Sequence, residues 1–265
     1  MILPVVMTVA GSDSGGGAGI QADIKTFHAL RVHGVCAVTS ITSQNTRGVI
    51  SRFDLPPEVV VSQMEAVFDD FAVAAVKTGM LANAEVVRAV AGILARYGAA
   101  NLVVDPVLFS SSGHRLMDEG GMEAVAEYLL PRAAFFTPNL AEAEAFTGIR
   151  VADLEGMREA ARALRDRGPG CVVVKGGHLG GKEAVDVFYD GARMLELSGP
   201  RIDATDDHGT GCVFSAALAA RLARGEAPKD AAAGARLDTV RSLENALRLG
   251  KGKGPVHPAV PQADR

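Results

Sequence analysis

The sequence predicts a three-layer αβα fold with a mostly parallel central sheet. Short apolar runs, of the kind that form buried strands, alternate with longer segments whose apolar residues recur at three- and four-residue spacing, as in amphipathic helices. The strand-like runs are apolar throughout rather than at alternate positions, which indicates strands covered by helices on both faces. In such a fold, ligands bind beyond the carboxyl ends of the strands.

The predicted elements follow one another in a regular order. Strand-like runs cover residues 4–10, 35–42, 72–79, 101–107, 133–139 and 171–177, and helical spacing covers 18–32, 57–71, 83–98 and 153–168. In segment 184–199, two strand-like runs flank Asp190 and Gly191, a pair typical of hairpin turns, so this segment predicts an antiparallel edge hairpin. We expect a single domain over residues 1–265, with a loose C-terminal tail from about residue 255.

Composition and charge favour a cytoplasmic protein with a small-molecule partner. The net charge of −4 and the scattered basic residues argue against binding to nucleic acid or to an anionic membrane. No apolar run approaches the roughly 18 residues that span a bilayer. Cys36, Cys171 and Cys212 stand far apart, which suggests neither disulfides nor a zinc site and fits a reducing compartment.

Two glycine-rich stretches invite a nucleotide-binding interpretation. Residues 176–183, GGHLGGKE, have the spacing of a P-loop, but Glu183 stands where that motif needs Ser or Thr, and a strand-like run follows, so we expect an ordinary turn. Residues 11–19, GSDSGGGAG, lack dinucleotide-binding spacing, yet they lie between a strand and a helix. We expect this turn to line a pocket.

A third glycine motif precedes an alanine-rich helical pattern. Gly209, Thr210 and Gly211 can direct several backbone N–H groups to one point at a helix start, where the helix dipole also favours negative charge. The alternative is a plain glycine turn. Cys212 follows at once, and because a helix N-terminus lowers a thiol pKa, we expect some thiolate at neutral pH.

Acidic and amide side chains follow two other predicted strands. Asp105, Asn139 and Glu142 place oxygen atoms at separate strand ends, suitable for holding a magnesium ion through water. The alternative is structural, because Asn139 with Glu142 three residues later is close to a helix capping box.

Taken in order, these motifs resemble those of a known family. The segments AGSDSGGGAGIQADIKTF, TSQNTRGV, VKTGML, VVDPV, TPNLAEAE, VVVKGGH and HGTGC, within residues 3–256, are similar to the hydroxymethylpyrimidine/phosphomethylpyrimidine kinases of the ribokinase-like superfamily, enzymes of the thiamin pathway. Most of that superfamily has an aspartate after the glycine motif. Cys212 therefore indicates this particular branch.

The resemblance implies a kinase that uses ATP and Mg²⁺. It would phosphorylate 4-amino-5-hydroxymethyl-2-methylpyrimidine, a pyrimidine alcohol, and then convert the monophosphate to the diphosphate. The pyrimidine would lie between the first glycine loop, which includes Gly11, and the motif at Gly209. Relatives of this kind are usually homodimers.

The resemblance also assigns individual residues. Gln44 would read the aminopyrimidine edge, Asp23 would approach the substrate hydroxyl, and Met80 would pack on the ring. Lys175 would meet the ATP phosphates, and Asp105 would also belong to the cofactor site. Without the resemblance, the first four would be a loop amide, a solvated helix carboxylate, a core methionine and a lysine that ends a strand.

Three departures from the family pattern bear on ligand binding. Asp206 and Asp207 replace an uncharged Asn and Thr, and two carboxylates should repel a polyphosphate unless a metal intervenes. Segment 107–116 carries serines where many relatives have a lysine. Lys251 and Lys253 replace a histidine-containing pattern.

Three other functions are weighed against this one. A pyridoxine or pyridoxal kinase acts on a hydroxymethyl group on a similar flat ring. A nucleotide-binding reductase would bind NAD(P)H. A catalytically inactive pyrimidine-binding protein would bind the ligand without consuming ATP.

Overall fold

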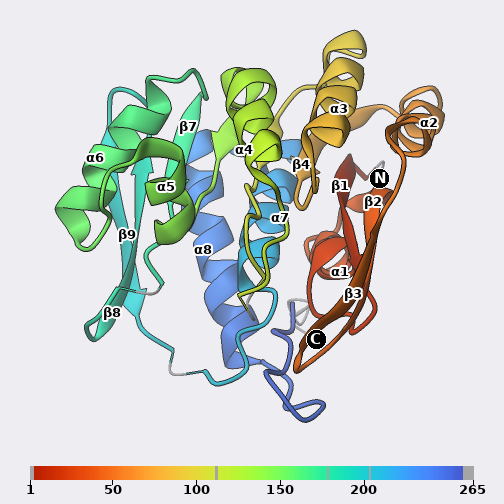
Figure 1. Ribbon diagram of the computed structural model, residues 1–265. Helices are drawn as coiled ribbons and strands as arrows, with labels where there is room; N and C mark the ends of the chain where they lie inside the picture. The colour runs from red at the N-terminus through yellow and green to blue at the C-terminus, as the bar shows by residue number, and fades with distance from the viewer. Residues whose placement is uncertain (1–2, 111–112, 178, 203, 259–265) are drawn as a thin grey trace.

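The computed structural model describes residues 3–110, 113–177, 179–202 and 204–258, which fold around a nine-stranded sheet (Figure 1). The order across the sheet is β3-β2-β1-β4-β5-β6-β7-β8-β9. The strands are β1 Val5–Asp13, β2 His33–Asn45, β3 Gly48–Asp54, β4 Val73–Thr78, β5 Leu102–Val104, β6 Phe135–Phe136, β7 Cys171–Val174, β8 Glu183–Tyr189 and β9 Met194–Pro200.

The six central strands, β2-β1-β4-β5-β6-β7 in sheet order, run parallel, and the outer pairings β2–β3, β7–β8 and β8–β9 are antiparallel. This confirms the predicted fold class. The edge hairpin over 184–199 is confirmed as well, since Tyr189 of β8 pairs with Met194 of β9 around the Asp190 turn. A second hairpin, β2–β3, forms the other edge and was not predicted.

Helices cover both faces of the sheet (Figure 1). One layer contains α1 Gly19–Ala29, α7 Thr210–Ala223 and α8 Pro228–Glu244. The other contains α2 Pro57–Phe68, α3 Ala84–Arg96, α4 Glu119–Ala124 with the short turns η1 Val125–Leu129 and η2 Leu130–Arg132, α5 Leu140–Thr147 and α6 Leu154–Arg165. No helix in the described ranges is both long and apolar enough to span a membrane.

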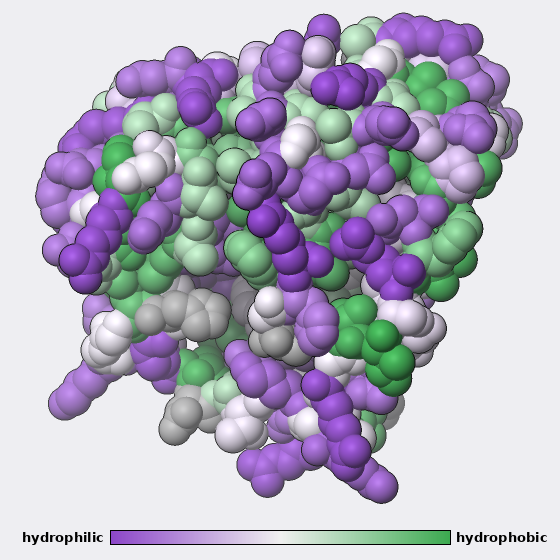
Figure 2. Space-filling view, viewed as in Figure 1, coloured by the Kyte–Doolittle hydropathy of each residue, from purple (hydrophilic) through white to green (hydrophobic). Residues whose placement is uncertain are grey.

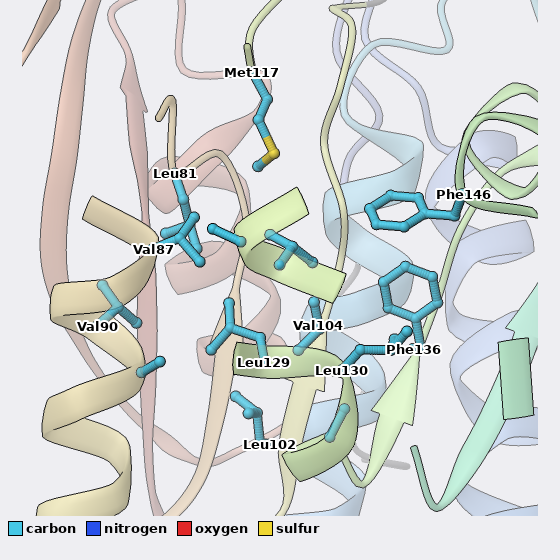
Figure 3. Packing of buried hydrophobic residues seen from close by; sticks show 14 of the residues in the cluster. Leu81, Val87, Val90, Leu102, Val104, Met117, Leu129, Leu130, Phe136 and Phe146 are labelled. Atoms are coloured by element: carbon cyan, nitrogen blue, oxygen red, sulfur yellow. The ribbon is translucent and has the colours of Figure 1, made fainter. Parts of the chain in front are cut away.

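Two apolar cores hold the helices on the sheet. Figure 3 shows the larger one, in which Leu81, Val87 and Val90 pack toward the strands, and Phe136 meets Phe146 edge to face with ring centroids 5.1 Å apart. Each such side chain contributes roughly 1.5–3 kcal/mol on burial. Helix α7 is alanine-rich because it is buried on most of its surface, packed against α1, α8 and the sheet. Its N-terminus is thereby fixed at the strand ends.

The C-terminal segment is docked further along than expected. Val256 is buried, and its N–H donates to the carbonyl oxygen of His208 at 3.0 Å, while the N–H of His257 donates to Ser242 at 3.0 Å. The expected loose tail therefore does not begin at residue 255. Residues 259–265 lie outside the described ranges.

Candidate functional site

A cavity of about 650 Å³ lies beyond the carboxyl ends of the parallel strands. Five successive strand ends contribute to its wall: Gly11 from β1, Met80 after β4, Asp105 after β5, Asn139 after β6 and Lys175 after β7. The N-terminus of α7 also lines it. The structure thus brings together most of the residues that the sequence singled out.

The motif at residues 209–211, which we call the cradle, forms the first turn of α7. Gly209 has φ +89°, in the left-handed region that favours glycine, and a Cβ there would overlap the carbonyl oxygen of Gly17. A Cβ on Gly211 would instead point into the cavity, 3.4 Å from Lys175 Nζ. The Thr210 hydroxyl donates to a carbonyl in the turn just before the helix. The cradle therefore leaves room for an anion beside a lysine at a helix N-terminus.

Asp13 organises the first glycine loop, a role that the sequence analysis missed. One carboxylate oxygen accepts a hydrogen bond from the Gly15 N–H at 2.8 Å, and the other accepts from Gly17 at 3.0 Å and Ala18 at 2.9 Å. His208 Nε2 lies 2.9 Å from the same oxygen. Burial opposes ionisation, but the hydrogen bonds from His208 and Gly15 outweigh it and hold the pKa of Asp13 below its usual value.

A second group of cavity residues, Gly11, Gln44 and Met80, which we call the ring end, is suited to a flat polar ring. Gln44 Oε1 accepts from the Thr42 hydroxyl at 3.2 Å, and its Nε2 lies 3.2 Å from His208 Nε2. The sulfur of Met80 lies 3.4 Å from the position that a Cβ on Gly11 would take. Gly11, Gln44 and Met80 all line the same cavity.

Asp23 occupies a different environment from either one expected. It is fully buried, not solvated, and its carboxylate accepts from the Thr8 hydroxyl at 2.6 Å and from Lys77 Nζ at 2.9 Å. Lys77 itself lines the cavity. Although burial acts to lower it, the charge of Asp23 raises the pKa of Lys77 above its usual value, so the lysine stays charged. Asp23 therefore contacts a lysine that lines the cavity, and its own carboxylate is not part of the cavity lining.

Cys212 is half-buried at the N-terminus of α7. Burial is the main effect, and together with the nearby charges of Asp23 and Asp105 it raises the pKa of Cys212 to about 11, against the opposing charge of Lys77. The raised pKa argues against the expected thiolate at neutral pH.

Lys175 forms a buried ion pair beside the cradle. Its Nζ lies 2.8 Å from Asp105 Oδ1, while Asp105 Oδ2 accepts from the Ser215 hydroxyl at 3.0 Å. Burial acts to lower it, but Asp105 and Glu142 raise the pKa of Lys175 above its usual value. A permanent positive charge therefore faces the space in front of Gly211.

Asn139 and Glu142 form a complete capping box on α5. Asn139 Oδ1 accepts from the Glu142 N–H at 2.9 Å, and Glu142 Oε2 accepts from the Asn139 N–H at 2.8 Å. The predicted capping box is thus confirmed. Burial, with a smaller contribution from Asp105, raises the pKa of Glu142 to about 7 against the opposing effect of Lys175.

The fit of a metal ion depends on these carboxylates. In the described part of the chain, no three His, Cys, Asp or Glu side chains converge as a ready set of metal ligands. Asp105 and Glu142 both line the cavity, however, and Mg²⁺ commonly keeps several waters and uses only one or two protein carboxylates. The residues present suit a hydrated Mg²⁺.

Asp206 and Asp207, the two aspartates that depart from the family pattern, contact the segment that carries the unexpected lysines. Asp206 Oδ1 accepts from the Gly254 N–H at 2.6 Å, and Asp207 Oδ1 lies 3.1 Å from Lys253 Nζ. The expected repulsion of a polyphosphate is therefore reduced within the protein itself. Lys251 is exposed on the same segment.

The remaining motifs are structural or lie outside the described residues. Glu183 begins β8 after the glycine turn, so the P-loop spacing at 176–183 does not lead into a helix, as expected. Arg201 donates to the carbonyl oxygens of Gly177 and Gly181 in this turn, the second at 3.0 Å. Of the serines in segment 107–116, Ser111 and Ser112 lie outside the described ranges.

Comparison with known proteins agrees with this arrangement. A family model described as phosphomethylpyrimidine kinase matches residues 13–257. A hydroxymethylpyrimidine/phosphomethylpyrimidine kinase of Rhizobium meliloti is 48% identical over 256 residues, which cover 96% of each chain. A thiamine biosynthesis bifunctional protein of Geobacter sulfurreducens is 46% identical over 252 residues, or 95% of this chain and 51% of that protein.

A solved structure shows the same fold with ligands bound. The pyridoxal kinase of Staphylococcus aureus in complex with AMP-PCP and pyridoxal superposes with a TM-score of 0.92 at 33% identity, covering 100% of this chain and 96% of that one. AMP-PCP is an analogue of ATP, which supports ATP as the phosphate donor. The family match over nearly the whole chain, and the cradle, glycine loop and lysine assembled around one cavity, place this chain in the phosphomethylpyrimidine kinase family, as a phosphotransferase of ribokinase-like fold.

Proposed function

We propose that the protein transfers a phosphoryl group from ATP to the hydroxymethyl group of 4-amino-5-hydroxymethyl-2-methylpyrimidine, and then phosphorylates the monophosphate to the diphosphate for thiamin synthesis. One observation carries the proposal: a single cavity is lined by Gln44 and Met80, by the cradle, and by Lys175 close to the cradle. This arrangement suits an alcohol on a flat ring facing a polyphosphate.

The ring end supports an aminopyrimidine. The Gln44 amide offers both a donor and an acceptor, and an aminopyrimidine edge presents the complementary pair. Met80 is an adaptable apolar side chain that can pack on the ring. Gly11 brings the backbone close to that methionine without a side chain of its own.

The cradle end supports phosphoryl transfer. This reaction depends mainly on positioning and charge neutralisation, which the backbone N–H groups of residues 209–211 and the charged Lys175 provide. A hydrated Mg²⁺ held by Asp105 and Glu142 through water would add charge neutralisation at the phosphates. Asn139 would serve this site indirectly, because its amide oxygen already caps α5. Cys212 would act as a neutral group near the alcohol.

The main alternative substrate is pyridoxal or pyridoxine, supported by the structural likeness to the Staphylococcus aureus kinase. The pyrimidine is preferred because the chain is more similar to the Rhizobium meliloti enzyme, at 48% identity. A coupled assay of ADP release separates the possibilities. The pyrimidine alcohol, its monophosphate and pyridoxine are compared with and without Mg²⁺. An inactive pyrimidine-binding protein would bind the alcohol yet release no ADP with any of them.

A homodimer in the cytoplasm is the second part of the proposal. Ile41 and Phe53 pair directly across β2 and β3, and they are 50% and 64% exposed, while Ile50 is 75% exposed. Figure 2 shows a hydrophobic patch over β3, which is an edge strand in the described sheet. A second copy would cover it. Analytical ultracentrifugation of the parent and Phe53→Glu tests this proposal, since the variant should sediment as a monomer.

A further inference from the structure

The segment of residues 247–256, which we call the strap, crosses from the β2–β3 hairpin to the cradle. The Lys253 N–H donates to the carbonyl oxygen of Thr46, at the hairpin turn, at 2.9 Å. One residue later, the carbonyl oxygen of Gly254 accepts from the His208 N–H at 3.2 Å. The backbone of Lys253 is therefore held from both sides.

The glycines that flank Lys253 allow the backbone of the strap to approach other backbone atoms closely. A Cβ on Gly252 would overlap the carbonyl oxygen of Thr46, and a Cβ on Gly254 would overlap that of Leu247. Neither glycine has a positive φ. Glycine is therefore required at both positions by the close approach of other backbone atoms and not by the backbone conformation. The side chain of Lys253 thus starts from a fixed position.

Three other cations that line the cavity form ion pairs with buried carboxylates. Lys77 Nζ lies 2.9 Å from Asp23. Lys175 and Arg236 lie 2.8 and 3.0 Å from their partners, and all three pairs have side chains at most 15% exposed. Separating such a pair leaves a buried charge unpaired, which is costly.

Lys253 differs from these three cations. Its side chain is 55% exposed and that of Asp207 is 33% exposed, with Nζ 3.1 Å from the nearer carboxylate oxygen. Exposed ion pairs of this kind contribute little, so the lysine can exchange partners at small cost. Both residues line the cavity.

The position of the pair relates it to the substrate. Asp207 directly precedes His208, which contacts Gln44, and the cradle begins immediately after His208. Lys253 approaches from Thr46, two residues beyond Gln44. The pair therefore borders the space between the ring end and the cradle, where a phosphate on the hydroxymethyl carbon would lie.

We propose that Lys253 is a specificity-determining residue that leaves Asp207 to bind the phosphate of the monophosphate substrate. This inference rests on the proposed second phosphorylation. A phosphate monoester carries a charge of about −1.5 to −2 at neutral pH, more than a carboxylate, so it competes well for the ammonium group. The alcohol offers no anion, and the Lys253–Asp207 pair stays closed when it binds. Asp207 thus competes with the substrate phosphate.

The test uses two substitutions with opposite expected effects. Lys253→Met should lower the ratio of kcat/KM for the monophosphate to kcat/KM for the alcohol by about 10-fold, because a charge-assisted hydrogen bond is lost. Asp207→Asn should raise the same ratio, by about 2- to 5-fold, because the lysine is released from its competitor. Lys251→Met is the matched control, an exposed lysine on the same strap, and should leave the ratio unchanged.

A purely structural role would give a different pattern. If Lys253→Met and Asp207→Asn lower kcat/KM for both substrates equally, or shift the ratio in the same direction, the inference is wrong. The second phosphorylation is tested separately by turnover of the monophosphate in the parent. If the parent does not turn over the monophosphate, calorimetric measurement of monophosphate binding still tests the inference. Weaker binding by Lys253→Met supports it, whereas equal binding, or no binding by the parent, overturns it.

Discussion

His208 Nε2 lies 2.9 Å from Asp13 Oδ2, and this contact joins two loops that are 195 residues apart in the sequence. The loops also pack closely there, because a Cβ on Gly17 would overlap the His208 ring and a Cβ on Gly209 would overlap the Gly17 carbonyl oxygen. The first glycine loop and the start of the cradle are therefore held against each other by these contacts.

Asp13→Asn should destabilise the protein by about 1–3 kcal/mol at pH 7, because charge-assisted hydrogen bonds to a buried carboxylate are weakened. The pKa of Asp13 is lowered in the folded state, so its contribution is complete above the usual value of 3.8 and is lost as the pH falls through the folded value. Urea unfolding of parent and variant should therefore converge at acid pH. A difference that persists undiminished at pH 3 would contradict this assignment.

Gln44→Ala should weaken binding of the pyrimidine alcohol by about 1–3 kcal/mol, because the polar edge of the ring would lose its partner in the cavity. Affinity for ATP should hardly change, since Gln44 lies at the ring end. Calorimetry with each ligand measures both. Equal affinity of parent and variant for the alcohol would remove Gln44 from the site.

Glu142→Ala should shift the Mg²⁺ dependence of activity to higher concentration and also cost roughly 1 kcal/mol of stability through the lost cap. Activity titrations and thermal unfolding separate the two effects. If stability falls while the Mg²⁺ titration is unchanged, Glu142 serves only its helix.

The charge of Glu142 gives a separate pH test, with Glu142→Gln as the control. The pKa of Glu142 is raised to about 7, so between the usual value of 4.5 and 7 the folded state binds more protons than the unfolded state. In the absence of metal, the parent should therefore gain stability relative to Glu142→Gln as the pH falls from 7 to 4.5. No change across this window would show that the buried carboxylate is already ionised.

Cys212→Ser should lose only about 10- to 100-fold in kcat, at or below the bottom of the range for a lost general base. The pKa of Cys212 is raised to about 11, so no thiolate forms across neutral pH. The kcat profile between pH 6 and 9 should have no ascending limb that depends on this residue. A loss beyond about 10³-fold, with an ascending limb in the parent that the variant lacks, would identify the cysteine as the base.

Substitutions of the two cradle glycines should act differently from each other. Gly211→Ala should fold normally, because its methyl group points into the cavity near Lys175, and should lose more kcat than Cys212→Ser because it occupies the space in front of the N–H groups. Gly209→Ala should lower the melting temperature as well, since its φ is +89° and Gly17 lies against it. Full activity in both variants would refute the cradle.

The fold class could be predicted because buried parallel strands appear in the sequence as continuous apolar runs, whereas amphipathic helices appear as apolar residues at three- and four-residue spacing. The β2–β3 hairpin was missed because β3 is an edge strand whose apolar residues, such as Ile50, are exposed and form no continuous run. Among the site residues, Gly11, Gln44 and Met80 all line the cavity, and their roles toward a substrate stay predictions.

The interactions of Asp23 and Asp13 could not be predicted, since their partners Lys77 and His208 lie far away in the chain. Local sequence suggested a solvated helix position for Asp23. For Cys212, local sequence supplied the helix N-terminus but not the burial and the neighbouring charges that raise the thiol pKa.

The strap can be removed without removing any part of the sheet or of its helix layers. All nine described strands and α1 to α8 precede residue 247 in the chain, and the contacts of Thr46 and His208 are made with residues 253–256 beyond them. A chain terminated near residue 246 would therefore keep a folded core but leave the wall of the cavity open beside the cradle.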